Sequence, residues 1–238
     1  MSRLVIFGDS FAAERPDSEA WPKLLAEKYD VPVKYYSFPA TNIEYTSIKL
    51  FQYLETDYKE DDIIVLVLTS SARAPIVHDD YYPSWAPMYK FSLLDPDFLE
   101  NLGNKHVTQH MNEHKQYYET WQRYFNPLIH QSTCYFITKT VNSLPNKKLV
   151  LSGFSDSDPK ITKTAIDCHP GGNLFDISCL EYEDNYTVES FRGRDKRANH
   201  LSPENHYIML DYVYSCLENG CTDLDYSKFK QAFYTKKS

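Results

Sequence analysis

Residues 63–68 read Ile-Ile-Val-Leu-Val-Leu, and this run limits the possible folds more than any other part of the sequence. A span across a bilayer needs about 20 apolar residues, so the run is too short to be one. Apolar residues without alternation are typical of a central parallel strand that is covered on both faces. Residues 4–7, Leu-Val-Ile-Phe, repeat the pattern. The sequence therefore predicts a sheet buried between two layers.

Helical patterns lie between the predicted strands at 4–7, 31–38 and 63–68. Residues 21–29 carry apolar side chains at helical spacing, with Ser18 as the expected N-cap and Pro22 in the first turn. The order strand, helix, strand, helix, strand predicts a parallel α/β sheet with right-handed crossovers.

The second of these helices has its own start signal. Thr41 and Glu44 have the spacing of a capping box, in which Glu44 bonds back to the Thr41 amide. Further along the chain, strands are expected at 148–153 and 173–178. A helix is expected across 117–144, with Pro127 as a point where it can be interrupted, and the last helix begins at Pro203 and ends near Gly220.

An insertion at about 73–115 interrupts the alternation, within what we expect to be one domain over 1–238. It is rich in aromatic residues, and segments of that length without periodicity are commonly functional. Two interpretations of its rings stay open: a wall beside a binding site, or a small core of the insertion itself. The rings are those of Tyr81, Tyr82, Trp85, Tyr89 and Phe91.

Charge and cysteine content exclude several classes of protein. Lys and Arg together number 25 against 33 Asp and Glu, a net charge of −8. An acidic chain does not favour binding to nucleic acid or to an anionic membrane, since both need clustered cations. The five cysteines form no C-x-x-C pair, which predicts reduced thiols rather than disulfides or a zinc site. Without a signal-peptide or transmembrane pattern, the expected location is cytoplasmic.

Two segments carry candidate chemistry. Gly8-Asp9-Ser10 follows the first strand, and His200 comes just before the last helix. Loops and helix N-termini converge at the carboxyl edge of an open parallel sheet, so Ser10 and His200 can meet there. A serine hydroxyl needs a base to become a nucleophile, and imidazole suits that role at neutral pH. Asp9 is expected to brace the loop by hydrogen bonding.

These residues resemble the SGNH/GDSL hydrolase family. Residues 7–12, Phe-Gly-Asp-Ser-Phe-Ala, are similar to its first block, and 38–42, Phe-Pro-Ala-Thr-Asn, to its second. Residues 62–70 resemble the strand that leads to its third block, and His200 with Leu201 and Ser202 its fifth. The resemblance implies a flavodoxin-like three-layer α/β/α sandwich with a central parallel sheet, Ser10 as nucleophile and His200 as base.

Three positions depart from the family pattern. Ala40 stands where a glycine amide donates to the oxyanion, and Ser70, or Thr69 beside it, stands in place of an asparagine. The usual acid, three residues before the histidine, is Arg197, so Asp195 is the nearest carboxylate that could orient His200. Asn42 completes the set of expected substrate-binding residues.

The expected function is hydrolysis of a small acyl ester, with an O-acetyl group on a carbohydrate as one candidate, and without a cofactor or a metal. The expected partner is a small-molecule or carbohydrate ester, and the oligomeric state stays open. One alternative is a binding or structural protein with a degenerate site. Another is metal-dependent hydrolysis through His106, His110 and His114, which recur every four residues.

Overall fold

Parallel strands form the centre of the molecule. A computed structural model describes residues 1–9, 11–13, 20–38, 41–69, 120, 127–152, 201, 203–220 and 228–229. Within these residues the sheet has the order β2-β1-β3-β4, and every neighbouring pair is parallel. The strands are β1 (Leu4–Phe7), β2 (Val33–Tyr35), β3 (Ile63–Leu68) and β4 (Lys148–Ser152).

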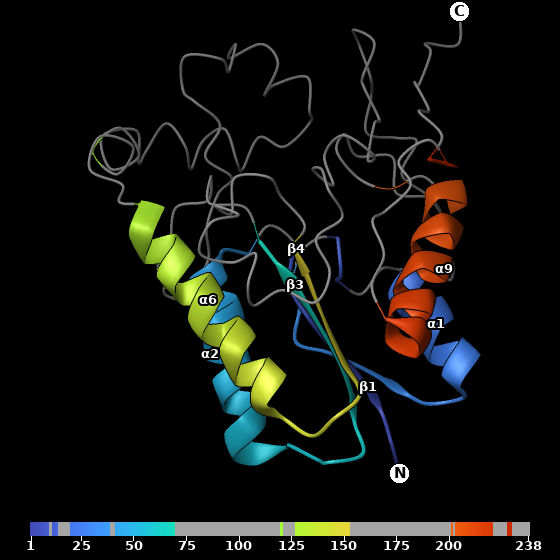
Figure 1. Ribbon diagram of the computed structural model, residues 1–238, viewed down its shortest axis with the longest axis horizontal. Helices are drawn as coiled ribbons and strands as arrows, with labels where there is room; N and C mark the ends of the chain where they lie inside the picture. The colour runs from blue at the N-terminus through green and yellow to red at the C-terminus, as the bar shows by residue number, and fades with distance from the viewer. Residues whose placement is uncertain are drawn as a thin grey trace, which may run out of the picture.

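Helices cover both faces of this sheet, as Figure 1 shows. α1 (Trp21–Tyr29) packs against α9 (Pro203–Asn219) on one face. α2 (Ile43–Thr56) packs against α6 (Pro127–Ser143) on the other. The three-layer α/β/α sandwich with a central parallel sheet is therefore confirmed for the described part of the chain.

The apolar strands supply both layers of the core, because successive side chains point to opposite faces. Leu4 and Ile6 of β1 join the cluster under α1 and α9, whereas Val5 and Phe7 join the cluster under α2 and α6. β3 divides its residues in the same way. Each fully buried side chain of this size contributes about 1.5–3 kcal/mol, so these unbroken runs supply much of the stability.

The starts of two helices differ from the sequence predictions. Asn42, not Thr41, is the N-cap of α2, and its Oδ1 accepts from the Tyr45 amide at 2.9 Å. The Thr41 amide donates to the Phe38 carbonyl, so the capping box with Glu44 does not form. α1 has Ala20 at its N-cap position rather than the expected Ser18, while Pro22 lies in its first turn as predicted.

β2 is shorter than the predicted 31–38. It ends at Tyr35, and Ser37 and Phe38 after it bond to the segment that follows β1. The Phe38 amide donates to the Gly8 carbonyl at 3.3 Å, and Ser37 Oγ donates to the Ala12 carbonyl at 2.7 Å. The predicted start of α9 at Pro203 and its end before Gly220 are confirmed. α6 begins at Pro127, where the sequence places an interruption of the helix expected over 117–144, and of the residues expected before it only position 120 is described. The strand expected at 173–178 lies outside the described residues.

The strand order fixes where a ligand would bind. β1 lies between β2 and β3, and the connecting helices α1 and α2 cover opposite faces. In open α/β sheets such a reversal of direction is the point at which ligands bind, beyond the carboxyl ends of the strands. Gly8 and Thr69 directly follow β1 and β3 at this edge.

Two observations bear on the predicted class of protein. No helix within the described ranges is long and apolar enough to cross a bilayer. Cys134 and Cys216 are buried and are not joined in a disulfide. The other three cysteines lie outside the described residues.

Candidate active site

Gly8 brings the end of β1 directly against β3. Its φ of +142° is unfavourable for any residue with a side chain. A Cβ at this position would lie 2.9 Å from Val67 Cβ and 3.0 Å from the Val67 carbonyl oxygen. Both the backbone conformation and the close approach therefore require glycine, immediately before Asp9.

The loop after Gly8 is held by Asp9, as the sequence predicts. Asp9 is fully buried, and its Oδ1 accepts from the Phe11 amide at 3.0 Å. Its carbonyl accepts from the Ala12 amide, also at 3.0 Å. Position 10 itself lies outside the described residues, but the residues on both sides of it are buried and hydrogen-bonded.

The entry to α2 is bonded to the same strand end. Thr41 Oγ1 lies 3.0 Å from the Gly8 carbonyl and 3.0 Å from the Phe38 carbonyl. This side chain joins β1, the end of β2 and the start of α2. The positive end of the α2 dipole is thereby fixed at the carboxyl edge, where it favours negative charge.

Two buried polar groups at this edge have no partner among the described residues: Asn42 Nδ2 and Thr69 Oγ1. The side chain of Asn42 is 1% exposed and that of Thr69 is 0% exposed. Since Asn42 Oδ1 is used to cap α2, its NH2 group is the part that can bind a ligand. Buried polar groups are normally paired, so groups without a described partner at this edge are candidates for binding a ligand.

Glu44 lies in the first turn of α2, and burial raises the pKa of its carboxyl. A hydrogen bond from its own backbone opposes this effect but is the smaller of the two. The absence of the predicted bond to the Thr41 amide agrees with this direction, because that bond would favour the carboxylate.

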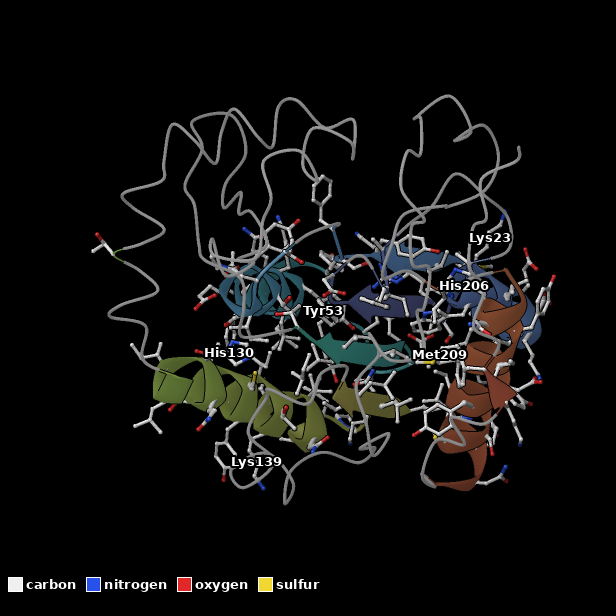
Figure 2. All side chains as sticks on the ribbon, turned by 90° about the horizontal axis from the view of Figure 1, so that it is seen from above. Lys23, Tyr53, His130, Lys139, His206 and Met209 are labelled. Carbon is white, nitrogen blue, oxygen red and sulfur yellow. The ribbon has the colours of Figure 1, made fainter. Side chains whose placement is uncertain are left out.

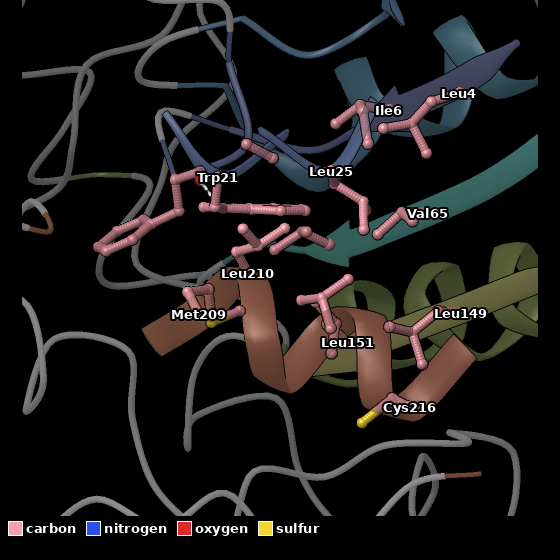
Figure 3. Close-up of a cluster of buried hydrophobic side chains, with 14 of the residues drawn as sticks. Leu4, Ile6, Trp21, Leu25, Val65, Leu149, Leu151, Met209, Leu210 and Cys216 are labelled. Atoms are coloured by element: carbon pink, nitrogen blue, oxygen red, sulfur yellow. Dashed lines mark hydrogen bonds between the residues drawn. The ribbon is translucent and has the colours of Figure 1, made fainter. Parts of the chain in front are cut away.

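α9 begins close to this loop, as the bonds of Trp21 show. The Trp21 indole Nε1 donates to the Phe11 carbonyl at 2.8 Å, and its backbone amide donates to His206 Nδ1 at 3.3 Å. Figure 2 labels His206 near the start of α9, and Figure 3 shows the Trp21 ring close to Leu210 of that helix. Leu201, the neighbour of position 200, is buried in the same cluster.

Of the predicted site residues, Asn42 and Thr69, the alternative to Ser70, fall within the described part of the chain. Ser10, Ala40, Ser70, Asp195 and His200 lie outside it. So do the insertion at 73–115 and the histidines at 106, 110 and 114. Among the described residues, no group of three or more His, Cys, Asp or Glu side chains could hold a metal ion.

Sequence reasoning misses two further residues at this edge, Trp21 and His206. The spacing of Trp21 places it on the apolar face of α1, and nothing in that spacing indicates a bond to Phe11. His206 lies within the predicted last helix, where a single histidine does not indicate any particular contact. Thr69 enters the sequence analysis only as a neighbour of Ser70, and its position directly after the run at 63–68 is the available signal.

No family model matches the sequence, and no curated protein sequence matches it either. Solved structures do resemble it. One is the psychrotrophic esterase EstA from Pseudoalteromonas sp., inhibited by monoethylphosphonate, at 15% identity and a TM-score of 0.47, covering 90% of this chain and 94% of that one.

Two other solved structures are similar to the same extent. A protein of the lipolytic G-D-S-L family from Desulfitobacterium hafniense has 11% identity and a TM-score of 0.44, covering 89% of this chain and 97% of the other. TesA has 12% identity and a TM-score of 0.49, covering 92% of this chain and 98% of the other. At these identities the likeness is one of fold.

Proposed function

We propose that this chain is a serine esterase of the SGNH/GDSL type, with Ser10 as nucleophile and His200 as base. The observation that carries the proposal is the pair of buried groups without a partner among the described residues, Asn42 Nδ2 and Thr69 Oγ1, at the edge where the Gly-Asp-Ser segment begins. Such a site suits a substrate that brings its own acceptor oxygen, as an ester carbonyl does.

The reaction follows from the chemistry of these groups. Ser10 Oγ attacks the ester carbonyl while His200 accepts its proton and later returns it to the leaving alcohol. Water then hydrolyses the acyl-enzyme by the same route. Asp195 orients His200 and stabilises the imidazolium that forms.

Donors at the start of α2 and the end of β3 would stabilise the oxyanion of the tetrahedral intermediate. We assign this role to the amides of Ser10 and Ala40, with the Asn42 side chain and the hydroxyl of Ser70 or Thr69. The α2 N-cap geometry supports the assignment, because it commits Asn42 Oδ1 to the helix and leaves the NH2 group without a partner in the described part of the chain. The dipole of α2 adds to the stabilisation.

A neutral small ester is the proposed substrate class, with an acetylated carbohydrate as the finer proposal. The net charge of −8 disfavours a polyanionic substrate. The carbohydrate part follows from the family resemblance. A comparison of acetylated xylo-oligosaccharides with p-nitrophenyl acetate and butyrate tests it, and preference for the butyrate ester would contradict it.

The test of the reaction uses a fluorophosphonate probe and p-nitrophenyl acetate. We expect the probe to label Ser10, as located by mass spectrometry, and Ser10→Ala to abolish both labelling and turnover. Ser143→Ala is the matched control, since the Ser143 hydroxyl bonds the Thr140 carbonyl on the exposed side of α6. Equal turnover by wild type and Ser10→Ala, or no labelling of the wild type, would favour the degenerate binding protein instead.

A further inference from the structure

Trp21 connects two segments that are far apart in the sequence. Its indole Nε1 donates to the Phe11 carbonyl at 2.8 Å, and its backbone amide donates to His206 Nδ1 at 3.3 Å. His206 lies 185 positions away in the chain. All three residues are buried, so water does not compete for either bond.

The first bond acts on the loop that contains position 10. Asp9 holds the Phe11 and Ala12 amides from within this loop. From outside it, Trp21 holds the carbonyl of Phe11, the residue directly after position 10. Trp21 therefore fixes the peptide between Phe11 and Ala12, one residue beyond the proposed nucleophile.

The second bond replaces a missing helix cap. Ala20 occupies the N-cap position of α1 and provides no side-chain acceptor. The Trp21 amide is one of the donors that a helix N-terminus leaves unpaired. His206 Nδ1 accepts from it, which requires a neutral imidazole with its proton on Nε2.

The same bond fixes the start of α9. His206 lies in the first turn of that helix, which begins at Pro203, and Leu201 is buried in the cluster that also contains Trp21 and Phe11. The segment next to position 200 is therefore bound to α1 by one hydrogen bond and by apolar packing.

We propose that Trp21 and His206 are positioning residues that hold Phe11 and Leu201, the described neighbours of Ser10 and His200, in a fixed relation. The inference rests on the proposed function, in which these two side chains must meet. A displacement of about 1 Å between reacting groups can cost about a hundredfold in rate. The relay of Phe11, Trp21 and His206 prevents such a displacement.

The test compares His206→Leu, which removes the acceptor, with His206→Asn, whose Oδ1 can replace Nδ1. We expect His206→Leu and Trp21→Phe to lower kcat per fluorophosphonate-titrated site by about tenfold to a hundredfold, with KM within about twofold. His206→Asn should restore most of kcat. Met209→Leu is the matched control, since Met209 is buried on the same helix within the same cluster.

A purely structural role would lower the titrated fraction or the Tm but leave kcat per titrated site unchanged, and that result would overturn the inference. Additive losses in the Trp21→Phe/His206→Leu double variant would also overturn it, because members of one relay are not independent.

Hydrogen exchange separates this inference from the proposed function. We expect amide exchange in residues 9–12 to be at least about tenfold faster in His206→Leu than in wild type and His206→Asn. Unchanged exchange there would overturn the coupling even in an active enzyme. A wild type that is neither labelled nor active would refute the proposed function, and faster exchange would still establish the coupling.

Discussion

The buried polar groups at the amino ends of the strands, here called the amino edge, differ in their hydrogen bonding from those at the carboxyl ends, the carboxyl edge. At the amino edge, Asp62 accepts from Arg3 through both oxygens and from the Tyr53 hydroxyl. Asn146 donates to three backbone carbonyls and accepts from the Tyr58 hydroxyl. At the carboxyl edge, Asn42 Nδ2 and Thr69 Oγ1 have no partner among the described residues.

This difference suggests two tasks within one sheet: the groups at the amino edge stabilise the fold, and those at the carboxyl edge are available to a ligand. Paired buried groups fix the structure, whereas unpaired donors cost free energy until a ligand binds them. Arg3 shows the first case, since the hydrogen bond to Asp62 raises the pKa of its guanidinium. Loss of a paired group at the amino edge should therefore alter stability alone, whereas loss of Asn42 Nδ2 or Thr69 Oγ1 at the carboxyl edge should alter activity first.

The largest effect is expected for Asp62→Ala at the amino edge. The change removes one of the two carboxylates that bind Arg3 and the acceptor of the buried Tyr53 hydroxyl, and we expect a loss of about 3–5 kcal/mol in the free energy of unfolding. Urea unfolding measures it. Asp61→Ala is the matched control, because this exposed side chain lies 3.8 Å from the amino terminus in a solvent-screened pair. A fall in kcat of folded Asp62→Ala would contradict the separation of the edges.

Thr69→Val tests the carboxyl edge. Loss of one oxyanion donor costs about a hundredfold in kcat, while removal of a buried hydroxyl that has no partner among the described residues leaves the stability equal or raises it by about 1 kcal/mol. Thr138→Val is the control, since Thr138 is equally buried in α6 and its Oγ1 also lacks a partner in the described ranges, but it lies away from this edge. Steady-state kinetics and thermal unfolding separate the two, and an unchanged kcat in Thr69→Val would remove Thr69 from the site.

Gly8→Ala tests the close approach of β1 to β3. We expect the free energy of unfolding to fall by about 2–4 kcal/mol, because of the unfavourable φ and the contact with Val67. Gly220→Ala isolates the first cause, because Gly220 also has a positive φ, of +85°, but a Cβ added there would meet no described atom within 4 Å. Gly220→Ala should lower the free energy of unfolding by about 1 kcal/mol. Equal losses in urea unfolding would show that the Val67 contact is unimportant.

The smallest effect concerns the pH dependence at the amino edge. Hydrogen bonds from Lys34, Tyr36 and Arg3 hold the pKa of Asp57 well below its ordinary 3.8. Because the folded pKa is lowered, this stabilisation is present above about pH 4 and is lost as the pH falls further. Asp57→Asn should therefore lower the free energy of unfolding by about 1 kcal/mol at about pH 7, a small effect because the site is partly exposed. The loss should become progressively smaller in acid. A difference from wild type that stays constant down to about pH 2 would contradict this.

The sheet can be predicted from the sequence better than the site. Residues 4–7 and 63–68 can be assigned because unbroken apolar runs leave little choice but a strand covered on both faces. Helix starts are harder, since Thr41 and Asn42 are both good caps and only the bond from Thr41 to Gly8 decides between them. Trp21 and His206 cannot be paired from the sequence, because their contact depends on the docking of α1 against α9.

That contact also has a consequence for the order of folding. β1, β2 and β3 with α1 and α2 come from the first 70 residues, yet α9 is added from residues 203–219. Until α9 has been synthesised, the cluster that contains Leu4, Ile6 and Val65 lacks its α9 side chains, and the Trp21 amide lacks its acceptor. Contacts of such sequence separation form late. A nascent chain of this protein therefore has β1, β2 and β3 long before α9 packs against them.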